Sequence, residues 1–97
     1  MINLAELGRA FSVCGKTDMR RGIDSLAYIV KESFNLDPFS GYVFLFCGSL
    51  RDCFKALYWD VQGYWLLYKR FENGKLAWQS NEDEVRELSE EQIMRLM

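Results

Sequence analysis

Hydrophobic positions near the start of the chain follow the period of an α-helix. Between residues 18 and 34 the apolar side chains stand three, four, seven and eleven residues after the first of them, which places them on one helical face. Thr17 is a suitable N-cap before this stretch, and Asn35 can take the left-handed position after it. The sequence therefore predicts one amphipathic helix over residues 18–34, with an apolar face of Ile23, Leu26, Ala27, Val30 and Phe34.

Short apolar runs without this period are typical of β-strands and occupy much of the remaining chain. We expect strands at about residues 10–14, 42–47, 53–60, 64–71 and 75–79. Two turn signals separate the last three strands: Val61-Gln62-Gly63, interpreted as a three-residue loop with glycine in the left-handed position, and Asn73-Gly74. The middle of the chain therefore predicts an antiparallel β-meander.

A capping box marks a second helix near the end of the chain. Ser89 and Gln92 stand directly before the apolar residues Ile93 and Leu96. We expect a short C-terminal helix that is truncated at residue 97. The predicted fold class is α+β: an antiparallel β-meander of four to five strands packed against one N-terminal amphipathic helix, with the short C-terminal helix in addition.

The composition is that of one globular domain. A chain of 97 residues with 49% hydrophobic residues can bury a core but is too short to split, so we expect a single domain over residues 1–97. The longest apolar run, residues 42–47, is far shorter than the roughly 20 residues of a membrane span. Three widely spaced cysteines, Cys14, Cys47 and Cys53, are typical of free thiols. We therefore expect a cytoplasmic protein with no membrane association.

The sequence offers little for catalysis. It contains no histidine, which excludes histidine general bases, histidine-activated nucleophiles and histidine metal ligands. Neither glycine-rich nucleotide-binding motif is present. The candidate acids, Asp18, Asp24, Asp60 and Glu72, share no predicted face, and the first three have structural explanations at a helix start, a helix surface and a turn. We expect no enzymatic activity, no metal site and no cofactor.

Charge is distributed unevenly along the chain. Residues 1–80 hold ten Lys and Arg against eight Asp and Glu, whereas residues 81–97 hold two against six. The body is thus at +2 and the tail at −4, within a total of −2. We interpret this asymmetry first as a solvated acidic tail, and an anion-binding body is the alternative.

Basic side chains gather where the first helix is predicted to begin. Lys16, Arg20 and Arg21 surround free backbone N–H groups that favour an anion such as a phosphate or a partner carboxylate. Gly22 supports this interpretation, because glycine inside a helix costs about 1 kcal/mol relative to alanine and is usually present for close approach. The alternative is that both arginines are solvated or paired with neighbouring carboxylates.

The predicted hairpin places further cations together. A three-residue loop sets Asp60 opposite Tyr64 and Lys55 opposite Lys69, where two facing lysines would need an anion between them. Core packing explains most of the aromatic residues beside these lysines and Arg70, and the alternative is a platform for stacked bases or for an interface. The other face is predicted to carry the core residues Phe54, Ala56, Tyr58, Leu66 and Tyr68.

Several segments together carry a recognisable pattern: Thr17 to Leu26, Asp37 to Gly41, Lys55 to Asp60 with Gly63, and Lys69 to Gly74 with Trp78. In order and spacing, they resemble the small accessory protein TnpB of IS66-type insertion sequences, over about residues 9–96. Where that family has an arginine-rich stretch after a Phe-Val-Phe strand, only Arg51 keeps the charge here, and Gln79 replaces a proline after the tryptophan.

The resemblance implies a non-catalytic accessory role beside a separate transposase that carries the catalytic acids. On this basis we expect a protein that joins a transposase–DNA complex through a basic surface. The alternative is a protein-interaction subunit that binds the transposase or another accessory protein without touching DNA. The candidate residues for DNA or partner binding are Lys16, Arg20, Arg21, Arg51, Lys55, Lys69 and Arg70.

Overall fold

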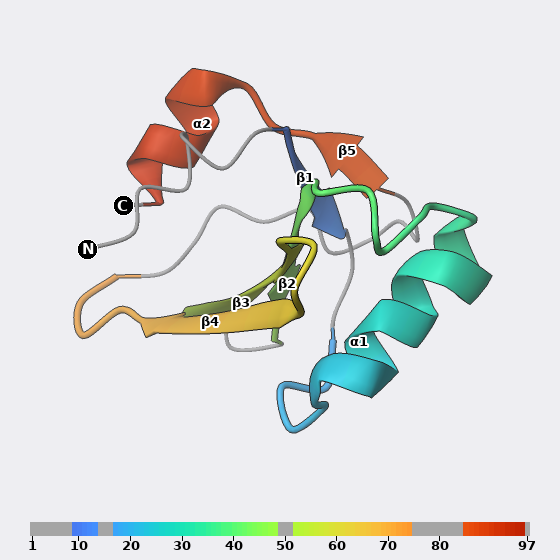
Figure 1. Ribbon diagram of the computed structural model, residues 1–97. Coiled ribbons are helices and arrows are strands. Elements are labelled where there is room, and N and C mark those ends of the chain that lie inside the picture. Colours follow the sequence, from blue (N-terminus) through green and yellow to red (C-terminus); the bar gives the residue numbers. More distant parts are fainter. Residues whose placement is uncertain (1–8, 14–16, 49–51, 75–84, 97) are drawn as a thin grey trace.

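Five β-strands form one sheet, and helical segments pack on both of its faces (Figure 1). The computed structural model describes residues 9–13, 17–48, 52–74 and 85–96. No helix among these residues is long and apolar enough to cross a membrane. The elements in chain order are β1 (Ala10–Val13), α1 (Ile23–Tyr28), the π-helical turn η2 (Ile29–Ser33), β2 (Val43–Cys47), β3 (Cys53–Trp59), β4 (Tyr64–Arg70), β5 (Val85–Glu87) and α2 (Glu90–Arg95).

The sheet is mixed, so the predicted α+β class is confirmed but the all-antiparallel arrangement is wrong. The strand order is β4-β3-β2-β1-β5, with β1 parallel to β2 and every other neighbouring pair antiparallel. The helical stretch between β1 and β2 returns the chain to the same end of the sheet, and such a crossover gives parallel pairing. The meander prediction holds for β2–β3–β4. We predicted no strand at β5, and the predicted strand at residues 75–79 lies outside the described residues.

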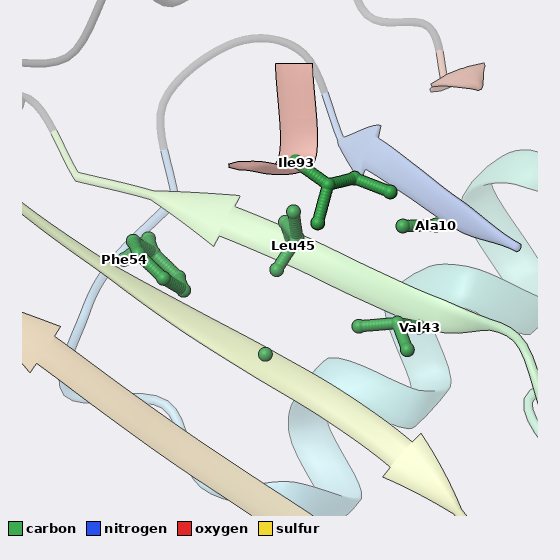
Figure 2. Packing of buried hydrophobic residues seen from close by; sticks show 6 residues of the cluster. Ala10, Val43, Leu45, Phe54 and Ile93 are labelled. Atoms are coloured by element: carbon green, nitrogen blue, oxygen red, sulfur yellow. The ribbon is translucent and has the colours of Figure 1, made fainter. Parts of the chain in front are cut away.

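Strand β2 lies at the centre of the sheet and is buried on both faces. All five of its residues are buried, because α2 covers one face and α1 the other. Figure 2 shows the α2 side, where Ile93 of α2 lies over Leu45 near Ala10, Val43 and Phe54. The α1 side is built from Val13, Leu26, Val30, Phe44, Phe46 and Leu57. A strand covered on both faces needs a continuous apolar run, and residues 43–47 supply it.

Strand β1 is held on both edges. Ala10 O accepts a hydrogen bond from Leu88 N at 2.8 Å, next to β5, and Arg9 O accepts one from Val43 N at 2.8 Å, at the start of β2. The Arg9 guanidinium reaches the Glu87 carboxylate with two hydrogen bonds of 2.6 and 2.9 Å and lies 4.9 Å from the Tyr42 ring centre. These contacts join the beginning, the middle and the last strand of the chain.

The first helix begins at Ile23, not at residue 18 as predicted. The Asp18 carboxylate accepts the Arg20 N–H at 3.0 Å and the Asp18 carbonyl accepts the Arg21 N–H at 3.0 Å, so residues 18–21 form a turn instead of a first helical turn. Gly22 is the N-cap of α1 and not a residue inside the helix, so the predicted placement of this glycine is wrong.

Two predicted helix boundary signals are confirmed, one at the C-terminus of the first helical segment and one at the N-terminus of α2. Asn35 has a φ of 54°, the left-handed conformation expected after the first helical segment. Ser89 Oγ accepts the Gln92 N–H at 3.2 Å, and Gln92 Oε1 accepts the Ser89 N–H at 2.8 Å, which completes the capping box of α2.

The hairpin between β3 and β4 has a two-residue loop, and the predicted three-residue loop is wrong. Asp60 N donates to Gly63 O at 3.1 Å, so these two residues close the hairpin around Val61 and Gln62. The left-handed residue is Val61, with a φ of 82°, and not Gly63. The pattern, with a positive φ only at the first loop position, is that of a type II′ turn, which prefers glycine there.

The shorter loop shifts the register by one residue. Lys55 pairs with Tyr68 and Lys69 pairs with Phe54, so the two lysines lie on opposite faces of the sheet. The predicted anion clamp between Lys55 and Lys69 is therefore wrong. For the same reason Leu66 and Tyr68 do not join Phe54, Ala56 and Tyr58 on the α2 side, where Leu67 takes that place.

We predict that Val61→Gly stabilises the protein. The Val61 side chain is 84% exposed and gives up little packing, whereas a β-branched residue at positive φ is strained, so relief of about 1 kcal/mol is expected. Thermal unfolding followed by circular dichroism measures this as a higher Tm. Gln62→Gly is the matched control, because Gln62 lacks a positive φ and the new glycine should bring no gain.

Candidate functional site

The seven predicted binding residues do not form one cluster. Arg20 and Arg21 lie in the turn before α1, and Lys55 and Arg70 extend from the sheet face that α1 covers. Lys69 lies on the α2 face. Lys16 and Arg51 lie outside the described residues. We refer to Arg20, Arg21, Lys55 and Arg70 as the α1-side cationic surface.

The turn before α1 is docked on the sheet by backbone groups. Thr17 N donates to Cys47 O at 3.0 Å, and Lys55 Nζ donates to Arg21 O at 3.0 Å. Met19 packs closely over Gly48, since a Cβ on that glycine would lie 2.6 Å from Met19 Cγ. The positions of Arg20 and Arg21 are thus tied to the ends of β2 and β3.

Arg20 is paired within its own turn. Its Nε and one terminal nitrogen each donate to the Asp18 carboxylate at 3.0 Å, while the Arg20 side chain stays 91% exposed. The hydrogen bond from the Arg20 side chain, together with that from its backbone N–H, lowers the pKa of Asp18 to about 2. The Asp18 carboxylate in turn raises the pKa of Arg20. This pairing is the alternative that the sequence left open for the arginines.

The other arginines of this surface also have side-chain partners. The Arg21 guanidinium donates to Ser25 Oγ, and the Arg70 guanidinium reaches Glu72 Oε1 at 3.3 Å in an exposed ion pair. Arg70 pairs with Cys53, two residues before Lys55 on the same strand, so Arg70 and Lys55 are diagonal neighbours on one face. Lys55 and Arg70 therefore lie together on the α1 side of the hairpin, and Lys55 joins them to the Arg21 backbone.

Tyr68 belongs to this surface, and sequence reasoning missed it. It stands opposite Lys55, is 56% exposed, and has a raised pKa because of a side-chain hydrogen bond with Cys53 and burial of its hydroxyl. The predicted register had assigned Tyr68 to the core. Aspartate at the first and glycine at the fourth position of a turn is a known signal, and at Asp60 and Gly63 it would have given the correct register.

Lys69 has a structural role on the opposite face. Its ammonium donates to Leu96 O at 3.0 Å, at the end of α2, and lies 5.2 Å from the centre of the Phe71 ring. The two lysines thus act alike on opposite faces, Lys55 holding the turn before α1 and Lys69 holding the end of α2. Cationic groups interact favourably with the carbonyl groups at a helix C-terminus, which explains the contact of Lys69 with Leu96 O.

The arrangement can bind an anion but shows no acid–base machinery. Within the ranges that the structure describes, no three His, Cys, Asp or Glu side chains gather as a metal site. Asp60, one of the acids considered for catalysis, accepts hydrogen bonds from the backbone N–H groups of Gln62 and Gly63 and from Trp65 Nε1 at 2.7 Å. Asp60 is thus a turn residue, as predicted. Guanidinium and ammonium groups such as those of the α1-side cationic surface have the chemistry to bind phosphate or carboxylate.

Comparison with known proteins connects this chain to one family. The profile of the family described as "IS66 Orf2 like protein" matches residues 8–97. Two similar proteins come from Sinorhizobium fredii (strain NBRC 101917 / NGR234). "Uncharacterized protein y4hO" is 36% identical over 92% of this chain and 77% of its own length. "Uncharacterized protein y4jC" is 31% identical over 82% of this chain and 68% of its own length. No solved structure matches.

We predict that the exposed pair between Asp18 and Arg20 makes a small contribution to stability that depends on pH in a defined window. The pKa of Asp18 is about 2 in the folded chain and near 4 when unfolded, so the contribution is present above about pH 4 and is lost as the pH falls towards 2. Urea unfolding of the wild type and Asp18→Asn between pH 6 and pH 2 should show a stability gap that closes on acidification. A gap of constant size would contradict this assignment.

Proposed function

Because this chain belongs to the IS66 Orf2-like family of transposition-associated accessory proteins, we propose that it acts without a catalytic centre and joins a transposase–DNA complex through the α1-side cationic surface. The transposase of the same element is the proposed protein partner, and DNA phosphate is the proposed ligand of the cations.

One observation carries this proposal: the hairpin register gathers cations and an exposed ring on one face. Lys55 and Arg70 are diagonal neighbours, Tyr68 stands between them, and Arg21 is bonded to Lys55 through its carbonyl. Arginine guanidinium groups bind phosphate oxygens in pairs, and a half-exposed tyrosine can stack on a base. Together these groups have the chemistry of a nucleic-acid contact.

The existing ion pairs are compatible with this role. Arg20 and Arg70 are bound to Asp18 and Glu72, but all four side chains are largely exposed. Exposed ion pairs contribute little to stability, so a phosphate can replace the carboxylate at small cost. Because guanidinium groups keep their charge at any physiological pH, release of the carboxylate leaves a binding-competent cation.

A second candidate function is protein binding without DNA contact, and exposed aromatic residues favour it. Phe39 is 55% exposed and packs edge-on against Trp59 at 4.8 Å between ring centres, with Tyr64 5.6 Å from Phe39. Interfaces between proteins are enriched in aromatic anchors of this kind. Lys16 and Arg51 remain predicted binding residues under either function.

We predict that replacing Arg20 and Arg21 together by alanine weakens DNA binding but leaves the fold intact. Binding of a duplex from an end of an IS66-type element, titrated at several salt concentrations, should show a slope of log K against log salt that is flatter by about 2. The Tm should change little, because the Arg20 side chain is 91% exposed.

The matched control is Arg95→Ala, which removes an exposed arginine from an ion pair with Glu91 on α2, away from the proposed surface. It should leave both affinity and salt slope unchanged. Unchanged DNA binding by the folded double variant would contradict the proposal. Capture of the transposase that survives nuclease treatment and tolerates the double variant would instead support the protein-binding function.

We also predict that the isolated protein does not cleave DNA in the presence of magnesium or manganese, since its acids have no shared site within the described ranges. Incubation of supercoiled plasmid with the protein and either metal should leave the plasmid intact. Metal-dependent cleavage that Asp60→Asn abolishes would contradict this prediction.

A further inference from the structure

We propose that two copies of this chain associate through the outer edges of their β4 strands, paired antiparallel about a two-fold axis at Leu67. The inference concerns the sheet edge and not DNA binding. In the dimer Arg70 and Tyr68 lie beside the partner, so a DNA contact on the α1 side would then rest on Arg20, Arg21 and Lys55.

Strand β4 is the long edge of the sheet. It lies at the end of the strand order, spans seven residues and contains neither proline nor glycine, whereas the other edge strand, β5, has three residues. Figure 1 shows β4 at one margin of the sheet, with α2 above the sheet and α1 near the other strands. None of the described residues forms a strand on the outer side of β4, and long uncovered edges are templates for pairing with another strand.

Two hydrogen bonds fix which backbone groups of β4 point outward. Asp60 N bonds Gly63 O, and Phe71 N bonds Asp52 O, so the odd-numbered residues of β4 direct their N–H and C=O groups towards β3. Hydrogen-bonded positions alternate along an antiparallel strand. The outward groups therefore belong to Tyr64, Leu66, Tyr68 and Arg70.

This alternation of inward and outward backbone groups along β4 restricts how two identical strands can pair. A two-fold axis requires antiparallel strands, and each outward residue must face another outward residue to exchange two hydrogen bonds. Centring the axis at Leu67 places Tyr64 opposite the partner's Arg70 and Leu66 opposite the partner's Tyr68. This register pairs all seven residues of β4. Centring the axis at Leu66 leaves Lys69 and Arg70 unpaired, and centring it at Tyr68 leaves Tyr64 and Trp65 unpaired.

The side chains of β4 are self-complementary in this register. Trp65 faces the partner's Lys69 on the α2 side, and Tyr64 faces the partner's Arg70 on the α1 side. Arg70 thus meets an aromatic ring, the stem of Lys69 lies beside Trp65 while its ammonium stays on Leu96 O, and no two cations face one another. Trp65 and Tyr68 are 50% and 56% exposed in the single chain, and both are covered when the partner's Lys69 stem and the partner's Leu66 pack against them.

The first test measures the oligomeric state. Sedimentation velocity over a concentration series should show the wild type passing from monomer to dimer. Tyr68→Pro removes an outward N–H while leaving the groups that bond β3, so it should raise the dimer Kd at least about tenfold, because symmetry deletes this donor twice. Tyr68→Ala keeps the N–H and should weaken the dimer less. Circular dichroism checks that both variants are folded.

The second test fixes the register without relying on proline. In Leu67→Cys the new thiols face one another across the axis at a Cα separation of about 4.5 Å, within the range of a disulfide, so oxidation should give a covalent dimer. In Leu66→Cys, the matched control, the two thiols are offset along the strands and should not couple. The wild type, oxidised in parallel, accounts for its native cysteines.

A chain that stays monomeric at all concentrations overturns the proposal, and protection of the outward β4 amides from hydrogen exchange in that monomer would show that the chain covers its own edge. Equal crosslinking of Leu67→Cys and Leu66→Cys would also overturn it. Loss of DNA binding in the Arg20 and Arg21 variant with an intact dimer leaves this inference standing.

Discussion

The closing pair of the β3–β4 hairpin decides how the other side chains are distributed. The Asp60 carboxylate accepts two backbone N–H groups of the turn and the Trp65 indole N–H, and the Trp65 hydrogen bond is the main cause of its lowered pKa. This one side chain fixes where the hairpin turns. Because side chains alternate between faces, a shift of one residue would exchange every residue of β4 between the α1 and α2 sides. The separation of Lys55 from Lys69 follows directly.

Local signals predicted the parts of the fold that depend on local chemistry. The apolar face of the first helix, the left-handed Asn35 and the capping box at Ser89 are each set by residues a few positions apart, and all are present in the structure. The predicted hairpin register was wrong because we assigned the left-handed position of the loop to Gly63. In the structure the residue with a positive φ is Val61. A rule based on the preference of glycine for positive φ cannot predict a positive φ at a valine. The wrong register also affected the predicted site, because it placed Lys55 opposite Lys69, whereas the two lysines lie on opposite faces of the sheet.

The parallel pairing of β1 and β2 could not be derived from the strand patterns themselves. Alternation of apolar and polar residues is the same in parallel and antiparallel strands, so a short strand such as Ala10–Val13 carries no sign of its direction. The wholly apolar run of β2 did contain information, since burial on both faces requires a covering element on each side. The turn at Asp18 was also missed, because an aspartate favours both a helix start and a local turn.

The position of β1 has a consequence for the order in which the chain can fold. β1 is synthesised before the other described strands, yet its two neighbours are β2, beyond a helical crossover, and β5, about 75 residues later in the sequence. The hairpin-linked strands β3 and β4 need only a short loop closure, whereas pairings between residues far apart in sequence form slowly. The N-terminal strand is therefore the last to be enclosed, and the sheet can close around it only after residues 85–88 have left the ribosome.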